Sequence, residues 1–201
     1  MNQNTIQGLY NIPAQVITGT TETALLVPAA GLYPGFPSPL QAAGTGLQLC
    51  WPADVQGADS IDCHPFKVRV VGKAFTGASI TLQTKLYQVP YSIVTAGTSA
   101  TLANDNVALS NAASAAFTGW ANFILEAQFL WDSSSQKLNT SFSTSLNQVN
   151  GAAVVPTSSI VSISYTAGNP INNLNFLPSF TFGTANAANS VTVTEFTLER
   201  L

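Results

Sequence analysis

The sequence predicts an all-β protein, an antiparallel β-sandwich of jelly-roll type with about eight strands. Only 7% of the 201 residues are charged, whereas about a quarter are charged in an ordinary soluble domain. Short segments in which apolar and polar residues alternate recur along the chain, as in half-buried strands. Turns rich in Gly, Pro, Asn and Ser separate these segments, which is typical of antiparallel sandwiches.

The N-terminal third is expected to be less regular than the rest. Residues 1–13 are predicted to form an extended arm, because they are polar and show no helical period, and residues 14–201 a single domain. A first strand is expected at 21–27. Residues 28–46 hold four prolines and four glycines, which predicts a long Pro/Gly-rich loop. A short strand over 47–51 follows, and then a second loop that ends at Pro65.

From Phe66 the alternation becomes regular. Residues 66–71 and 80–87 are predicted to be two strands of a hairpin joined by a turn at Gly77-Ala78, with a bulge at Gly72. Residues 96–120 are expected to be irregular with one short strand. The remaining strands are predicted at 122–131, 138–146, 159–165, 174–182 and 191–198, with a turn at 132–136.

The clearest strand is the one at 122–131. One of its faces is expected to be buried and is made of Phe123, Leu125, Ala127, Phe129 and Trp131. The opposite face carries Glu126 and Gln128.

Charge and hydropathy argue against two classes of partner. Six Lys and Arg residues in a chain of net charge −3 do not make the basic surface that a nucleic acid requires. No run of 18 apolar residues is present, so no membrane span is expected. The first residues lack the basic and apolar regions of a secretory signal, which predicts that the protein is made and assembled inside a cell.

The residues around positions 50–64 offer candidates for metal or nucleophilic chemistry. Cys50, Cys63 and His64 supply three potential zinc ligands where a closed structural site needs four. His64 is the single histidine, but neighbouring strand residues point to opposite faces, which disfavours catalysis by Cys63 and His64. Free thiols are favoured for the two cysteines, and their pairing stays open. A third group is a set of aspartates that could offer oxygen ligands to calcium, although a solvated acidic loop is the default: Asp54, Asp59 and Asp62.

Two further groups could take part in hydrolysing or binding a carbohydrate. Glu126 with Glu195 or Glu199 could provide the two carboxylates of a glycosidase, but charges that protect a sheet edge explain them equally well. Aromatic residues that could stack on a sugar form the other group: Tyr33, Trp51, Tyr87, Tyr91 and Trp120. No catalytic residue, metal ligand or cofactor is assigned, and the protein is not expected to be an enzyme.

Three segments together resemble a known family. They are residues 66–73 (FKVRVVGK), 125–133 (LEAQFLWDS) and 181–199 (TFGTANAANSVTVTEFTLE). They are similar to the small capsid decoration, or cement, proteins of tailed bacteriophages, which have a jelly-roll fold. The resemblance covers the chain from Phe66 onward. It implies a homotrimer on the outside of a virion capsid that bridges subunits of the major capsid protein, and it brings no site residues with it.

The expected function is therefore that of a capsid decoration protein, with the N-terminal arm and the 28–46 loop as candidates for capsid contact. The alternative is a carbohydrate- or receptor-binding β-sandwich module of a phage tail or fibre.

Overall fold

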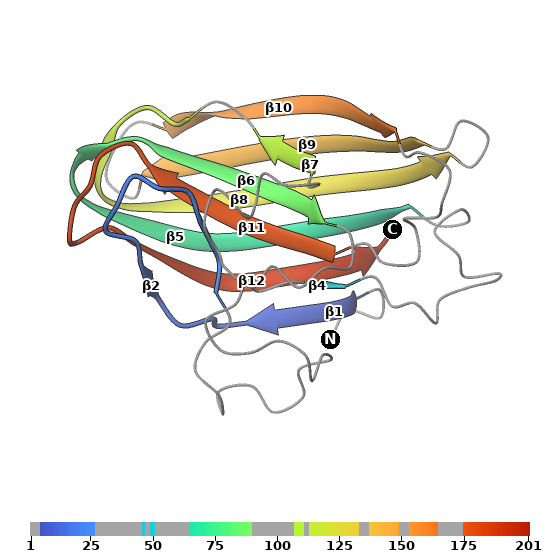
Figure 1. The fold of residues 1–201 in the computed structure, drawn as a ribbon, viewed down its shortest axis with the longest axis horizontal. Helices are drawn as coiled ribbons and strands as arrows, with labels where there is room; N and C mark the ends of the chain where they lie inside the picture. The colour runs from blue at the N-terminus through green and yellow to red at the C-terminus, as the bar shows by residue number, and fades with distance from the viewer. Residues whose placement is uncertain are drawn as a thin grey trace.

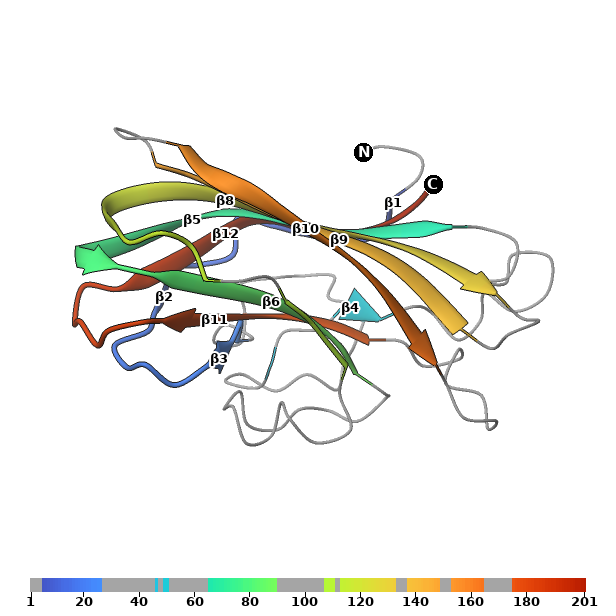
Figure 2. The same cartoon turned by 90° about the horizontal axis from the view of Figure 1, so that it is seen from above.

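Two antiparallel sheets face each other in a sandwich (Figures 1 and 2). The computed structural model describes residues 5–26, 46, 49–50, 65–89, 107–110, 113–132, 137–148, 153–164 and 175–201, and these contain strands but no helix. The predicted all-β antiparallel sandwich of jelly-roll type is confirmed, but the described residues form twelve strands rather than about eight.

The larger sheet has seven strands. In spatial order they are β1 (Thr5–Tyr10), β12 (Ser190–Arg200), β5 (Phe66–Ile80), β8 (Phe117–Asp132), β9 (Lys137–Gln148) and β10 (Ala153–Ser164), and the short β2 (Gln15–Val16) also pairs with β12.

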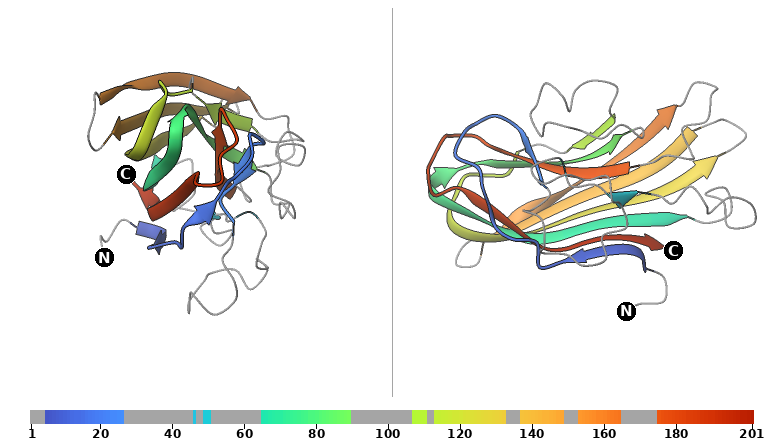
Figure 3. Two further views of the ribbon diagram at one scale, coloured as in Figure 1. Left: turned by 90° about the vertical axis from the view of Figure 1, so that its left-hand side faces the viewer. Right: turned by 60° about the horizontal axis from the view of Figure 1, so that its bottom comes forward.

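The smaller sheet has five strands. Their order is β3 (Thr23–Ala24), β11 (Asn175–Phe182), β6 (Leu82–Val89) and β7 (Val107–Ser110), with β4 (Leu49–Cys50) also paired to β11. Seen from the end, the larger sheet curves over the smaller one (Figure 3).

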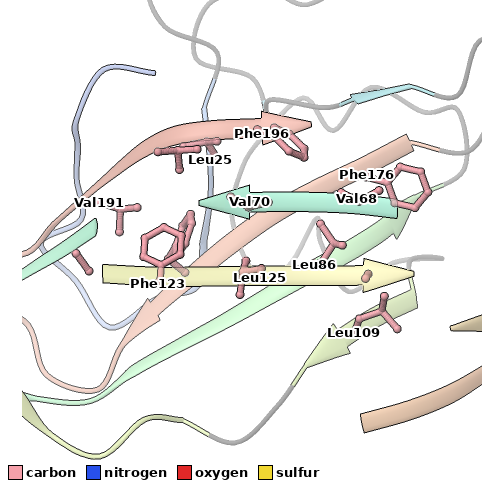
Figure 4. Packing of buried hydrophobic residues seen from close by; sticks show 14 of the residues in the cluster. Leu25, Val68, Val70, Leu86, Leu109, Phe123, Leu125, Phe176, Val191 and Phe196 are labelled. Carbon is pink, nitrogen blue, oxygen red and sulfur yellow. The ribbon is translucent and has the colours of Figure 1, made fainter. Parts of the chain in front are cut away.

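The core lies between the two sheets and is rich in phenylalanine. On β8, Phe123, Leu125, Ala127 and Phe129 are all buried, which confirms the predicted inward face for these four residues. The smaller sheet meets them with Leu86, Leu109 and a further phenylalanine, Phe176, as the close view shows (Figure 4).

Aromatic rings join the layers directly. The rings of Phe66 and Phe129, on neighbouring strands of the larger sheet, stack with centroids 4.8 Å apart and an interplanar angle of 11°. Phe176 of the smaller sheet packs against both, at 5.7 Å and 4.9 Å. Phe123 and Phe180 make a second contact between the sheets at 5.4 Å. Such aromatic pairs contribute about 0.5–1.5 kcal/mol each beyond the area that they bury.

The predicted hairpin between the strands at 66–71 and 80–87 is wrong. The two strands belong to different sheets, with β5 paired to β8 and β12, and β6 paired to β11 and β7. Gly77 and Ala78 do not reverse the chain but lie inside β5, where its register against β8 shifts between Thr76 and Ile80. The chain then crosses to the other sheet at Thr81. Alternation identifies a strand, but it does not identify the partner of that strand.

The bulge predicted at Gly72 lies on the neighbouring strand instead. Gly72 pairs with Val193 and Val71 pairs with Glu195, so Thr194 of β12 is the extra residue. Gly72 is required for a different reason. A Cβ atom there would collide with the carbonyl oxygen of Thr192 and would lie 2.7 Å from the ring of Phe123.

The segment predicted as an N-terminal arm is largely an edge strand of the larger sheet. β1 pairs with β12 through most of its length, and the Ile12 amide donates a hydrogen bond to the Val193 carbonyl at 2.9 Å. Leu9 and Ile12 are buried in the core. A few apolar residues in a polar segment are enough to anchor an edge strand, and no helical period is needed for that.

The other differences concern strand lengths. The strand expected at 21–27 is reduced to β3 and an isolated bridge from Leu26 to Gly46. β8 and β10 begin earlier than expected, at Phe117 and Ala153. Residues 28–45 and the turn at 133–136 lie outside the described residues.

Gly72→Ala is expected to destabilise the protein by about 1–3 kcal/mol, the usual cost of overpacking a core. Its Cβ would press on the backbone of β12 and on a buried ring, neither of which can move freely. Urea denaturation measures the effect. Gly19→Ala is the matched control, since its Cβ would meet nothing closer than 3.8 Å. Equal denaturation midpoints for the two variants would contradict this account of Gly72.

Candidate functional site

The outward face of the larger sheet carries two distinct groups of side chains. The first is a charged ladder formed by Lys67, Arg69, Glu126, Glu195 and Glu199. Lys67 pairs with Glu199 at 3.2 Å. Arg69 lies 3.1 Å from Glu195 and 3.9 Å from Glu126. The ladder follows directly from register, because Lys67 and Arg69 on β5 stand opposite residues of β12 on one side and β8 on the other.

The structure brings two of the predicted carboxylates together and explains what they do. Glu126 and Glu195 approach each other only through Arg69, which ion-pairs with both, while Glu199 belongs to Lys67. This is the arrangement of an ion-pair bridge. The alternative explanation, that these are edge charges, is wrong, because β8 and β12 both lie in the interior of the sheet.

The second group is an aromatic row near the other end of the same face. Register places Val16 of β2, Ser190 of β12, Phe75 of β5 and Trp120 of β8 side by side. Val16 is 62% exposed and Trp120 is 41% exposed. The rings of Phe75 and Trp120 lie 5.0 Å apart at an angle of 59°, so the phenylalanine fixes the indole in place.

A polar row runs next to the aromatic row. Thr192, Lys73, Asn122 and Asn147 stand opposite one another on β12, β5, β8 and β9. The Lys73 ammonium lies 4.5 Å from the centroid of the Trp120 ring, in a cation–π contact. We call the two rows together the Trp120 surface, whose principal members are Val16, Lys73, Phe75, Trp120, Asn122 and Asn147.

The outward face of the smaller sheet holds a third group, the Glu22 cluster, made of Glu22, Lys85, Tyr87 and Ser179. The buried Glu22 carboxylate accepts hydrogen bonds from the Ser179 hydroxyl at 2.5 Å and the Lys85 ammonium at 2.8 Å. Burial raises the pKa of Tyr87, and the negative charge of Glu22 and a hydrogen bond to its carboxylate raise that pKa further. The cluster attaches the segment before β3 to β6 and β11.

Sequence reasoning did not identify Glu22, Lys85 or Ser179. One signal was available, because Glu22 is the only charged residue among the first 53. If the carboxylate of such a segment is buried, a specific partner for it is expected, because unpaired charges are rarely buried.

The predicted aromatic platform is divided by the fold. Trp120 is on the outward face of the larger sheet, whereas Tyr87 is buried on the smaller sheet, so these two cannot contact one ligand. The other platform residues, Tyr33, Trp51 and Tyr91, lie outside the described residues.

The candidates of the 50–64 region also fall largely outside the described chain. This applies to Cys63, His64 and the aspartates Asp54, Asp59 and Asp62, while Cys50 is placed in β4 by its backbone. Among the residues that are described, no group of three or more His, Cys, Asp or Glu could hold a metal ion. The same part of the chain contains no helix long and apolar enough to cross a membrane.

Comparison with known proteins gives similarities of overall shape alone. No family model matches the chain, and no curated protein matches it. Among solved structures, lectin I of Ulex europaeus, in complex with the methyl glycoside of α-L-fucose, is 14% identical, with a TM-score of 0.40, over 99% of this chain and 93% of that one.

Two other solved structures give similar values. Lectin I-B4 of Griffonia simplicifolia, in its metal-free form, is 13% identical with a TM-score of 0.37, covering 96% of this chain and 93% of the lectin. The CBM2 module of the evolved Dit of Lactobacillus casei BL23 phage J-1 is 8% identical with a TM-score of 0.35, covering 94% and 95%. At this level of similarity, no residue role passes from those proteins to this chain.

The free energy of unfolding is expected to fall as the pH rises above about 10, in part because of Tyr87. Its pKa is raised above the ordinary value of 10.0, so at higher pH the unfolded chain loses the phenolic proton while the folded chain keeps it. The stabilisation is therefore complete below about pH 10 and is lost as the pH rises toward the raised pKa. Urea denaturation at about pH 9 and about pH 11 measures the slope, which Tyr87→Phe should reduce. Tyr10→Phe, which removes the hydroxyl of a residue that is 46% exposed, is the matched control. Equal slopes for Tyr87→Phe and wild type would contradict this assignment.

Proposed function

We propose that this β-sandwich is a non-enzymatic carbohydrate-binding module, of the kind that a phage tail or fibre presents to a receptor. The observation that carries the proposal is the Trp120 surface. A sugar ring has an apolar face of C–H groups and a rim of hydroxyls. The exposed part of the Trp120 indole offers an apolar surface for the face, and the exposed amides of Asn122 and Asn147 offer donors and acceptors for the rim.

The scaffold supports this use because it holds the site rigidly. Trp120 and Asn122 are on β8 and Asn147 is on β9, two strands that pair over twelve residues of register. Phe75 packs against the indole from the neighbouring strand. Binding therefore orders few side chains, which lowers its entropic cost.

The site lies on an open sheet face, so each contact is expected to be weak. A single site of this size is consistent with a Kd of about 0.1–1 mM, which corresponds to roughly −4 to −5.5 kcal/mol. Several copies on one particle would raise the apparent affinity through effective concentration, without any further contact.

A second candidate function is capsid decoration, as the sequence resemblance implies. It is favoured by the neutral outward face of β9, where Ser141, Ser143 and Asn147 are exposed, and by Leu130 of β8, which is 52% exposed. Uncharged surface has little desolvation cost when subunits meet. In this candidate function a homotrimer would bridge major capsid proteins on the virion surface after assembly in the host cytoplasm.

Trp120→Ala is expected to weaken glycan binding at least about tenfold, equivalent to about 1.4 kcal/mol. The stacking surface is lost, whereas the core is untouched because the indole points outward. A glycan array probed with the protein displayed on beads identifies ligands, and titration calorimetry measures the change in Kd. Leu130→Ala, which removes an exposed apolar side chain elsewhere on β8, is the matched control and should bind as wild type does.

The same two variants discriminate between the candidate functions. A wild-type protein that binds no glycan but forms trimers and adds to empty phage capsids would overturn the carbohydrate proposal in favour of decoration. In that case Leu130→Ala should reduce capsid occupancy more than Trp120→Ala does.

A further inference from the structure

We propose that the Trp120 surface selects sugars that carry an anionic substituent, and that the ammonium group of Lys73 binds it. The inference rests on the proposed carbohydrate-binding function and adds to it the class of ligand. A uronate carboxylate and a sugar phosphate share the chemistry that Lys73 would recognise.

The first argument concerns the ion pairs of the described cations. Lys67, Arg69 and Lys85 each have a carboxylate oxygen close by, at 3.2, 3.1 and 2.8 Å. Lys73 is exposed, and within the described ranges no carboxylate lies within 4.0 Å of it. The positive charge of Lys73 is therefore available to pair with a ligand, whereas the charges of Lys67, Arg69 and Lys85 are already paired with carboxylates.

The carboxylate next along the sheet is already engaged. Glu195 stands opposite Val71, one outward position away from Lys73 on β5. Arg69 donates to both of its oxygens, at 3.1 and 3.2 Å, and the Thr197 hydroxyl donates to Oε1 at 3.3 Å. Recruiting Glu195 to Lys73 would break these hydrogen bonds, so the ladder does not neutralise Lys73.

The position of the ammonium matches that of a substituent on a stacked ring. Lys73 Nζ lies 4.5 Å from the centroid of the Trp120 ring, over part of the indole. The residue Trp120 itself remains 41% exposed beside it. A sugar ring in contact with that exposed part would bring a carboxylate or phosphate on its rim within reach of Nζ. An ammonium offers three donors, and a hydrogen bond between two charged groups is shorter and stronger than a neutral one.

Repulsion from the charged ladder is limited by the pairing of its nearest carboxylate. Glu195 stands opposite Val71, two residues from Lys73, and two residues of strand span about 7 Å. This is within the Debye length of about 8 Å at physiological ionic strength, so salt alone does not remove the effect of Glu195. Arg69 lies 3.1 Å from Glu195 and offsets its charge, so only the weak field of an ion pair acts on a ligand at Lys73.

The test uses the full chain and three probes: an oligosaccharide of galactose, the matching oligosaccharide of galacturonic acid, and the galactose form phosphorylated at O6. Titration calorimetry at about 0.05 M and about 0.5 M salt measures each Kd. Wild type is expected to prefer at least one anionic probe about five- to tenfold at low salt, and to lose most of that preference at high salt.

Variants assign the preference to one side chain. Lys73→Gln should abolish the preference for the anionic probe over the neutral one, whereas Lys73→Arg should retain it. Lys67→Gln removes a cation that is already paired on the same face, and should keep the wild-type preference. A preference for the uronate alone, or for the phosphate alone, identifies which anionic group the ligand carries.

The possible failures are distinguishable. Equal binding of neutral and anionic probes, abolished by Trp120→Ala, would overturn the role of Lys73 and leave the carbohydrate-binding function standing. A preference that survives in Lys73→Gln would also overturn it. No binding of any glycan by wild type, on these probes and on the array, would remove the proposed function and this inference with it.

Discussion

The packing of phenylalanine rings between the two sheets is the interaction on which the rest of the structure depends. Among the residues that the structure describes, eight phenylalanines are fully buried, and burying one such side chain contributes about 1.5–3 kcal/mol. These rings come from both sheets. They therefore set the distance between the two layers and also stabilise the fold. Side chains alternate along a strand, and a strand whose inward positions are apolar therefore presents its intervening residues to solvent. The charged ladder and the Trp120 surface are the outward counterparts of this core.

The sequence was sufficient to predict fold class and most of the long strands, because both follow from local alternation. The inward face of β8 is the clearest case, with Phe123 and Leu125 buried as expected. Strand pairing was not predictable in the same way. β5 and β6 are consecutive and regular, yet they lie in different sheets, and only contacts distant in sequence determine that. The anchoring of β1 was missed for a related reason, since its partner, β12, is at the far end of the chain.

The candidate site was predictable only in part. Trp120 could be identified as an aromatic residue of interest, but alternation does not say which sheet or which outward face a residue occupies, and Tyr87 proved to be on the other side of the sandwich. Nothing in the sequence distinguishes Lys73 from the other five Lys and Arg residues. Lys73 stands out only because, within the described part of the chain, the neighbouring cations are paired with carboxylates and it is not. Strand register determines that pairing. The Glu22 cluster unites residues 157 positions apart, and no local pattern reports such a contact.

Except for Val16 of β2, the side chains of the Trp120 surface point outward from interior strands, and they stand apart from the layer of rings that holds the sheets together. Substitutions at these positions need not be compensated in the core. A lineage that carries this domain could therefore exchange one target for another by changing a few side chains, without passing through unfolded intermediates. The same separation makes the face a natural place to randomise residues when new binding specificities are to be selected in the laboratory.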